Sequence, residues 1–137
     1  MKVGESKVTT IENLTTFHDD KGEELTIYLG GFSNHSKVEI LKKLNNDIEG
    51  LSFRHFGDID FGGFSILSHL RRETGIAIMP LHMDIEMLKE RTSLSKKPSG
   101  IYLNKLKGLM SDEHLQDCHA VLQFMIRNQV ILEQETY

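Results

Sequence analysis

Three acidic residues have the types and spacing that metal-dependent chemistry needs: Glu12, Asp58 and Asp60. One residue separates the two aspartates, and in an extended segment side chains at positions i and i+2 point to the same side. Two carboxylates held close together repel unless a cation lies between them or one is protonated. Hard oxygen ligands that leave room for water and phosphate suit Mg²⁺ or Mn²⁺. The pair is therefore a candidate metal site. Glu12 could complete this site, or it could serve as a general acid or base.

The neighbours of the aspartate pair fit such a site but also fit a simpler role. Glycines flank the pair and would let a ligand approach the backbone: Gly57, Gly62 and Gly63. Asp-x-Asp is also common in turns and as N-cap chemistry before a helix, with no metal involved. His55 could contact phosphate or orient an aspartate, or it could be a packed strand histidine. Both alternatives stay open at this point.

The elements that must hold these residues alternate along the chain. Four short apolar runs are typical of strands: 8–11, 25–29, 51–56 and 76–79. Helical patterns follow, with a capping box at Ser36 and Glu39, a C-cap at Gly75, a short helix over 85–90 and a long last helix from about residue 111. This alternation predicts an α/β fold with a mostly parallel sheet of about four strands and helices on both faces. Ligand-binding residues of such folds gather at the carboxyl ends of the strands, where the three acids are expected.

Composition sets the class of protein. The chain has 137 residues, enough for one domain with its own core, and a single cysteine, Cys118, which excludes an internal disulfide framework. No stretch approaches the roughly 20 apolar residues that span a bilayer, and the polar N-terminus shows no secretory signal. We therefore expect a cytoplasmic protein that does not enter membranes.

The charge is unevenly distributed. A net charge of −4 argues against binding nucleic acid over the whole surface. Between residues 89 and 107, however, one acid stands among six basic residues: Lys89, Arg91, Lys96, Lys97, Lys105 and Lys107. The segment is either a solvated loop or a local patch that contacts phosphate. Its four later lysines are the candidates for contact with DNA.

Three motifs in order resemble a Toprim domain. They are Ile11-Glu12-Asn13-Leu14 through Phe17, Tyr28-Leu29-Gly30-Gly31-Phe32, and His55-Phe56-Gly57-Asp58-Ile59-Asp60 with Gly63-Phe64. More narrowly, the chain resembles the C-terminal Toprim domain of the nuclease subunit of the Wadjet anti-plasmid system, which is related to the A subunit of type VI topoisomerases. The resemblance covers about residues 8–84 and, more weakly, the end of the chain, where Leu132-Glu133-Gln134-Glu135 is similar to the acidic close of the family.

The resemblance implies a Toprim-like Rossmannoid fold over residues 1–137, as a C-terminal fragment of a longer protein. It implies that Glu12 is the general acid or base and that Asp58 and Asp60 hold Mg²⁺ or Mn²⁺ beside the scissile phosphate. Glu133 and Glu135 would add a second-metal contact. The residues expected to line the phosphate site are Gly30, Gly31, His55, Gly62 and Gly63. The expected partners are plasmid or other double-stranded DNA, other subunits of a defence complex and a second copy of the chain.

The resemblance to topoisomerases does not extend to strand passage. Topoisomerases pair the Toprim domain with a separate domain that carries a nucleophilic tyrosine, for which this chain has no room, and Tyr28, Tyr102 and Tyr137 have no special context. Hydrolysis by metal-activated water therefore fits better than strand passage.

Two further functions compete with a metal-dependent endonuclease. The first alternative is a non-catalytic Toprim-like module that binds DNA or partner subunits. The second is a small-molecule phosphatase of the haloacid-dehalogenase type, disfavoured because Gly62 replaces the usual Thr or Val.

Overall fold

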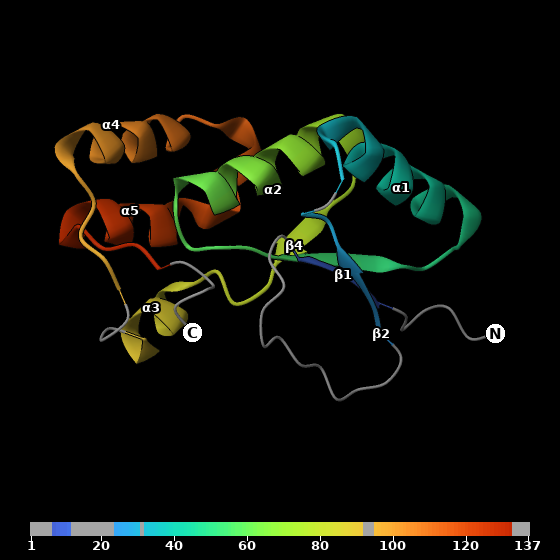
Figure 1. Ribbon diagram of the computed structural model, residues 1–137, viewed down its shortest axis with the longest axis horizontal. Coiled ribbons are helices and arrows are strands. Elements are labelled where there is room, and N and C mark those ends of the chain that lie inside the picture. Colours follow the sequence, from blue (N-terminus) through green and yellow to red (C-terminus); the bar gives the residue numbers. More distant parts are fainter. Residues whose placement is uncertain (1–6, 12–23, 31, 92–94, 133–137) are drawn as a thin grey trace.

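A computed structural model of the chain describes residues 7–11, 24–30, 32–91 and 95–132 (Figure 1). Its strands are β1 (Lys7–Ile11), β2 (Glu24–Tyr28), β3 (Ser52–Phe56) and β4 (Ile78–Pro80). Its helices are α1 (Asn34–Asp47), α2 (Phe61–Thr74), α3 (Ile85–Glu90), α4 (Gly100–Leu109) and α5 (His119–Asn128), with a 3₁₀ helix η2 (Glu113–Cys118) before the last. None of the helices in these ranges is long and apolar enough to cross a membrane.

The four strands form one parallel sheet in the order β2-β1-β3-β4. Ile11 is in register with Tyr28 on one side and with Phe56 on the other, and His55 is in register with Pro80. The carboxyl ends of all four strands therefore meet at one edge of the sheet. This confirms the predicted α/β class with a parallel sheet of about four strands, and it is consistent with the Rossmann-like fold that the Toprim resemblance implies.

Helices α1 and α2 lie side by side on one face of the sheet (Figure 1). Both crossovers, β2-α1-β3 and β3-α2-β4, step in the same direction across the sheet, so right-handed connections place both helices on the same face. A register row of Val8, Phe53 and Ile78 is buried in the core cluster that includes residues of both helices. The connection from β1 to β2 lies outside the described residues, so helices on both faces stay a prediction.

Several helix boundaries were predicted correctly and others were wrong. Gly75 is the C-cap of α2, at φ 70°, as predicted. The first helix does not begin at a capping box at Ser36: the N-cap is Ser33, whose hydroxyl accepts from the Ser36 amide at 3.1 Å. The predicted long last helix is also wrong. The segment instead begins with η2, whose backbone bends at Leu115, at φ −122°, and continues as α5, and both are shorter than α1 or α2.

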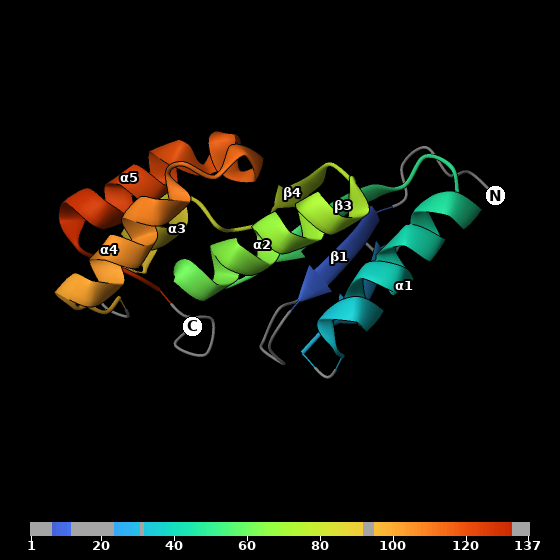
Figure 2. The same ribbon diagram turned by 90° about the horizontal axis from the view of Figure 1, so that it is seen from above.

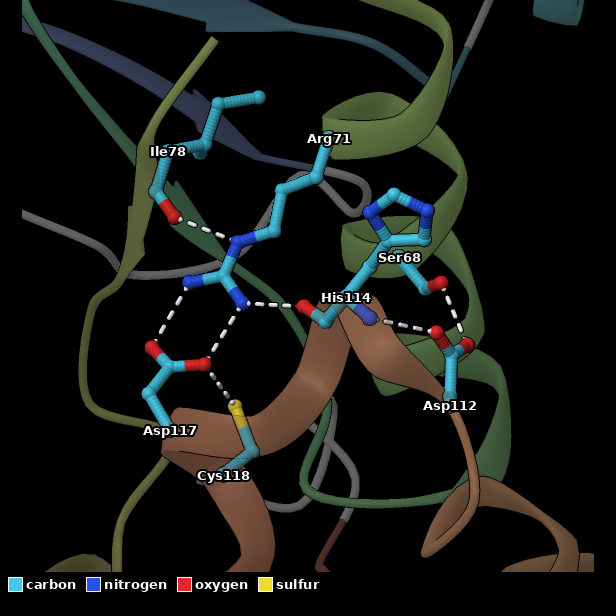
Figure 3. A network of polar contacts seen from close by, with 7 residues as sticks. All are labelled: Ser68, Arg71, Ile78, Asp112, His114, Asp117 and Cys118. Atoms are coloured by element: carbon cyan, nitrogen blue, oxygen red, sulfur yellow. Dashed lines mark hydrogen bonds and ion pairs between the residues drawn. The ribbon is translucent and has the colours of Figure 1, made fainter. Parts of the chain in front are cut away.

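A polar network ties η2 to α2 and β4 (Figure 3). Arg71 donates to the carbonyl of Ile78 at 2.9 Å, to the carbonyl of His114 at 2.6 Å and to both carboxylate oxygens of Asp117 at 2.7 and 2.9 Å. Beside it, the Ser68 hydroxyl donates to Asp112 at 2.6 Å. The Arg71 side chain is only 13% exposed, so these bonds replace contacts with water that it cannot make.

Arg71→Met is expected to lower the free energy of unfolding by about 2 kcal/mol at neutral pH, because two carbonyls and a carboxylate lose their donor. This value is below the roughly 3–5 kcal/mol that a broken buried ion pair costs, because Asp117 is half exposed. Arg72→Met, which removes an exposed pair with Glu73, should cost less than about 0.5 kcal/mol. Urea titration of both variants measures the two values. Equal effects would contradict the structural role of Arg71.

The same network predicts a dependence of stability on pH. Hydrogen bonds from Arg71 hold the pKa of Asp117 below its ordinary value of 3.8. A carboxylate with a lowered pKa stabilises the fold above its ordinary pKa, and that stabilisation is lost as pH falls through the lowered value. The difference in stability between wild type and Arg71→Met should therefore shrink in urea titrations below about pH 4. A constant difference from pH 7 to pH 2 would exclude this linkage.

Candidate metal centre

The aspartate pair lies on the turn from β3 into α2, at the carboxyl edge of the sheet. Asp60 is the N-cap of α2, with extended backbone, and its Oδ1 accepts the Gly63 amide at 2.8 Å. The N-cap role left open by the sequence is therefore confirmed for Asp60. Ile59 between the two aspartates is fully buried, whereas Asp58 and Asp60 are partly exposed. Both acids can thus meet a ligand while the residue between them anchors the turn.

At Gly63 the turn leaves no space for a side chain. A Cβ atom at Gly63 would lie 1.9 Å from the carbonyl oxygen of Asp58 and within 3 Å of its carbonyl carbon and nitrogen. Because these neighbours are backbone atoms, no side-chain rotation could make room for it. At Gly62 the nearest atom would be Asp60 Oδ1 at 3.6 Å, an ordinary contact. The first turn of α2 therefore packs directly against the backbone of Asp58.

The C-terminal segment holds the same turn from the other side. The Ile59 amide donates to the carbonyl of Leu132 at 2.7 Å, and the Leu132 amide donates back to Ile59 at 3.0 Å, in an antiparallel bridge. The preceding residue, Ile131, is bridged in the same way to Lys96 with both bonds at 2.9 Å. Glu133 follows Leu132 in the sequence. The chain segment that leads to the predicted second-metal acids therefore reaches the aspartate turn.

Helix α4 brings the basic segment to the site, as Figure 2 shows beside the first turn of α2. The Tyr102 hydroxyl accepts the Phe61 amide at 2.7 Å, and the two rings meet edge to face with centroids 6.5 Å apart. One turn further along α4, Lys105 Nζ lies 5.7 Å from the centroid of the Phe61 ring. Of the four candidate lysines, Lys105 thus lies on a helix in contact with the first turn of α2, and Lys96 is bridged to Ile131, the residue before Leu132. The other two, Lys97 and Lys107, are exposed nearby in sequence.

His55 is buried at the end of β3. Its Nδ1 lies 2.7 Å from Thr10 Oγ1 on β1, and its carbonyl accepts the Leu81 amide at 2.8 Å. The ring packs against Gly57, where a Cβ would lie 3.0 Å from Nε2. Within the described residues, Nε2 is buried with no hydrogen-bond partner. His55 is therefore a packed strand histidine whose contacts connect the ends of β1, β3 and β4. A contact between His55 and phosphate stays a prediction.

The protonation of His55 can be predicted from its surroundings. Burial, assisted by the charge of Lys37, lowers the pKa of His55 to about 3. The ring is therefore neutral at physiological pH, and its NMR signals should not shift between pH 5 and pH 8. A His55→Asn variant identifies the signals by their disappearance. Titration of these signals near pH 6.5 would show that the ring is open to water or paired with an acid.

Part of the predicted site lies outside the described residues: Glu12, Gly31, Glu133 and Glu135. Among the residues that the structure does describe, no three His, Cys, Asp or Glu side chains gather into a metal-binding group. Gly30 is exposed just after β2, at the same sheet edge. Glu12 follows Ile11, which ends β1 beside Phe56 of β3. The described part therefore supplies two carboxylates, from Asp58 and Asp60, and the scaffold around them.

The contact by which Tyr102 connects α4 to the aspartate turn was not predicted from the sequence. The local signal for α4 was present: Ser99 caps the helix by accepting the Tyr102 amide at 3.2 Å, and apolar residues recur at Leu103, Leu106 and Leu109. Lysines and glycines interrupt this apolar pattern, so it was not recognised as a helix. The bond to Phe61 joins residues 41 positions apart and has no local signature.

A parallel α/β sheet with an acidic pair at its carboxyl edge is a Rossmann-like arrangement, and ligand-binding residues of such folds generally lie at that edge. The chain belongs to the family described as "Wadjet protein JetD, C-terminal", whose model matches residues 1–137. The Wadjet protein JetD of Bacillus cereus (strain Q1) is 28% identical to it over 138 residues, which are 97% of this chain and 34% of the relative. The chain thus spans about a third of the length of that curated relative.

Proposed function

We propose that this chain is the Toprim-like catalytic domain of an anti-plasmid defence nuclease, which hydrolyses or nicks double-stranded DNA with Mg²⁺ or Mn²⁺. The observation that carries the proposal is the placement of Asp58 and Asp60. They lie together on one turn, at the carboxyl edge of a parallel sheet, in a chain of the JetD C-terminal family. A cytoplasmic location, other subunits of a defence complex and a second copy of the chain as partners belong to the same proposal.

Asp58 and Asp60 would hold the ion, and hard carboxylate oxygens are the donors that Mg²⁺ and Mn²⁺ prefer. When bound, the ion supplies charge neutralisation at the phosphate and promotes deprotonation of the attacking water. Glu12 is assigned the proton transfer, as general acid or base. Glu133 and Glu135 are proposed second-metal ligands, an assignment supported by the bridge between Leu132 and Ile59.

The basic residues would position the DNA backbone. Lys105 lies over Phe61 beside the aspartate turn, and Lys96 is bridged to Ile131 on the segment that reaches this turn, so their charges would favour phosphates near the site. Lys97 and Lys107 extend this patch along the same segment. Because the chain as a whole is acidic, at −4, strong DNA binding would depend on this patch and on other parts of the assembly.

Metal removal tests the proposal. The whole protein, incubated with supercoiled plasmid, should convert it to nicked or linear forms when Mg²⁺ or Mn²⁺ is present. Chelation with EDTA should stop the reaction, and added Mn²⁺ should restore it. Cleavage that continues undiminished in EDTA, or no cleavage in the complete defence complex with either metal, would contradict it.

One observation favours the non-catalytic module as a second candidate. Asp60 already caps α2, and within the described ranges only two acids face the proposed ion. A module of this kind would assemble or bind DNA through the basic segment, and plasmid cleavage by the complex would not depend on Asp58. Plasmid cleavage by the variants Asp58→Asn and Asp60→Asn separates the two functions.

A further inference from the structure

The first turn of α2 is capped by two side chains from distant parts of the chain. A helix N-terminus presents amide groups that have no partner within the helix. Asp60 accepts the Gly63 amide at 2.8 Å, and the Tyr102 hydroxyl accepts the Phe61 amide at 2.7 Å. The two acceptors therefore satisfy two amides of this turn, those of Phe61 and Gly63.

The Tyr102 hydroxyl is held firmly in this position. Its ring packs edge to face against Phe61, and α4 is anchored by its buried residues Leu106 and Leu109. Lys105, one turn on, lies over the Phe61 ring at 5.7 Å. Tyr102 and Phe61 are both partly buried, so the bond between them is only partly accessible to water. The contact is thus built by α4 as a whole.

We propose that Tyr102 is a positioning residue for the metal-binding aspartates, an inference that rests on the proposed function. By accepting the Phe61 amide, Tyr102 satisfies the donor that directly follows Asp60 in the chain. The Asp60 carboxylate then accepts the Gly63 amide, and this bond orients the carboxylate. Because residues 58–60 form a short turn fixed at Ile59 and Gly63, a fixed Asp60 also fixes its spacing from Asp58.

Loss of the hydroxyl leaves a partly buried amide without an acceptor beside a capping carboxylate. The Asp60 carboxylate cannot take over this role, because an N-cap side chain accepts from the second or third amide of the helix and Phe61 is the first residue of α2. In a Tyr102→Phe protein, the peptide that joins Asp60 to Phe61 therefore turns to hydrate its amide, and the Asp60 carboxylate moves with it. Groups that orient metal ligands typically change metal affinity by about 10- to 100-fold when they are removed.

The test is the Mn²⁺ dissociation constant of the whole protein, measured by electron paramagnetic resonance, for wild type and Tyr102→Phe. We expect at least about 10-fold weaker binding in the variant. Tyr28→Phe, on the partly exposed β2, is the matched control and should bind as wild type does. Arg71→Met controls for general destabilisation, because it weakens the fold away from the aspartate turn.

The outcomes separate this inference from the proposed function. Wild-type binding with an unchanged dissociation constant in Tyr102→Phe would overturn the role of Tyr102 and leave the metal site standing. Weakened binding in both Tyr102→Phe and Arg71→Met would also overturn it, because loss of stability would explain both. Absence of Mn²⁺ binding in the wild type would overturn the proposed function and this inference together.

Discussion

Gly63→Ala is expected to lower the free energy of unfolding by about 3 kcal/mol or more, the largest loss of stability that we predict for a single methyl group in this chain. The added Cβ would lie 1.9 Å from the Asp58 carbonyl oxygen. Relief requires the β3-α2 turn to separate from the helix, which would break the bond between Asp60 and the Gly63 amide. Equilibrium urea unfolding followed by circular dichroism measures the loss.

Gly62→Ala is the matched control, one residue earlier in the same turn. Its Cβ would have no neighbour closer than 3.6 Å and Gly62 is exposed, so stability should change by less than about 1 kcal/mol. The comparison isolates the close approach to Asp58 from the general effect of replacing glycine in a helix. Similar stabilities of the two variants would mean that α2 does not pack against Asp58 as described.

Asp58→Asn and Asp60→Asn are each expected to reduce plasmid cleavage by the whole protein by about 100-fold or more. Electrostatic stabilisation by a bound metal contributes several kcal/mol, and each 1.36 kcal/mol corresponds to a factor of ten in rate. Asparagine is chosen because it retains N-cap ability, so Asp60→Asn can keep its bond to Gly63 while losing the charge. The initial rate of nicking measures the effect.

Asp47→Asn is the control for the loss of one negative charge. Asp47 forms an exposed pair with Lys43 at the end of α1, away from the carboxyl edge. Its cleavage rate should equal that of the wild type. If Asp58→Asn cleaves as fast as Asp47→Asn, the aspartate pair is not catalytic and the binding-module function is favoured.

The scaffold of the site could be predicted from local patterns. Short apolar runs separated by helical periodicity define the strands, and the parallel sheet then brings the ends of β1 and β3 together without further information. The caps at Gly75 and Asp84 were likewise predictable, since each depends on residues within one helical turn. Asp-x-Asp followed by two glycines marked the turn where the acids lie.

The contacts around the turn could not be predicted in the same way. Leu132 meets Ile59 from 73 positions away, and Tyr102 meets Phe61 from 41, so neither depends on a local sequence preference. Both follow from how α4 packs against α2 and α5 packs against α4, which is a property of the assembled core. The bend at Leu115 has the same origin: the bonds of Arg71 to His114 and Asp117 hold η2 against α2 where periodicity alone predicts a continuous helix.

The most direct test of the metal site is Mn²⁺ binding to the whole protein, measured by electron paramagnetic resonance on wild type and on Asp58→Asn/Asp60→Asn. This measurement does not depend on DNA or on other subunits. We predict that the wild type binds Mn²⁺ and that the double variant, with the turn still folded, loses this binding. Equal binding by the two proteins, or no binding by the wild type, would contradict a metal centre at Asp58 and Asp60.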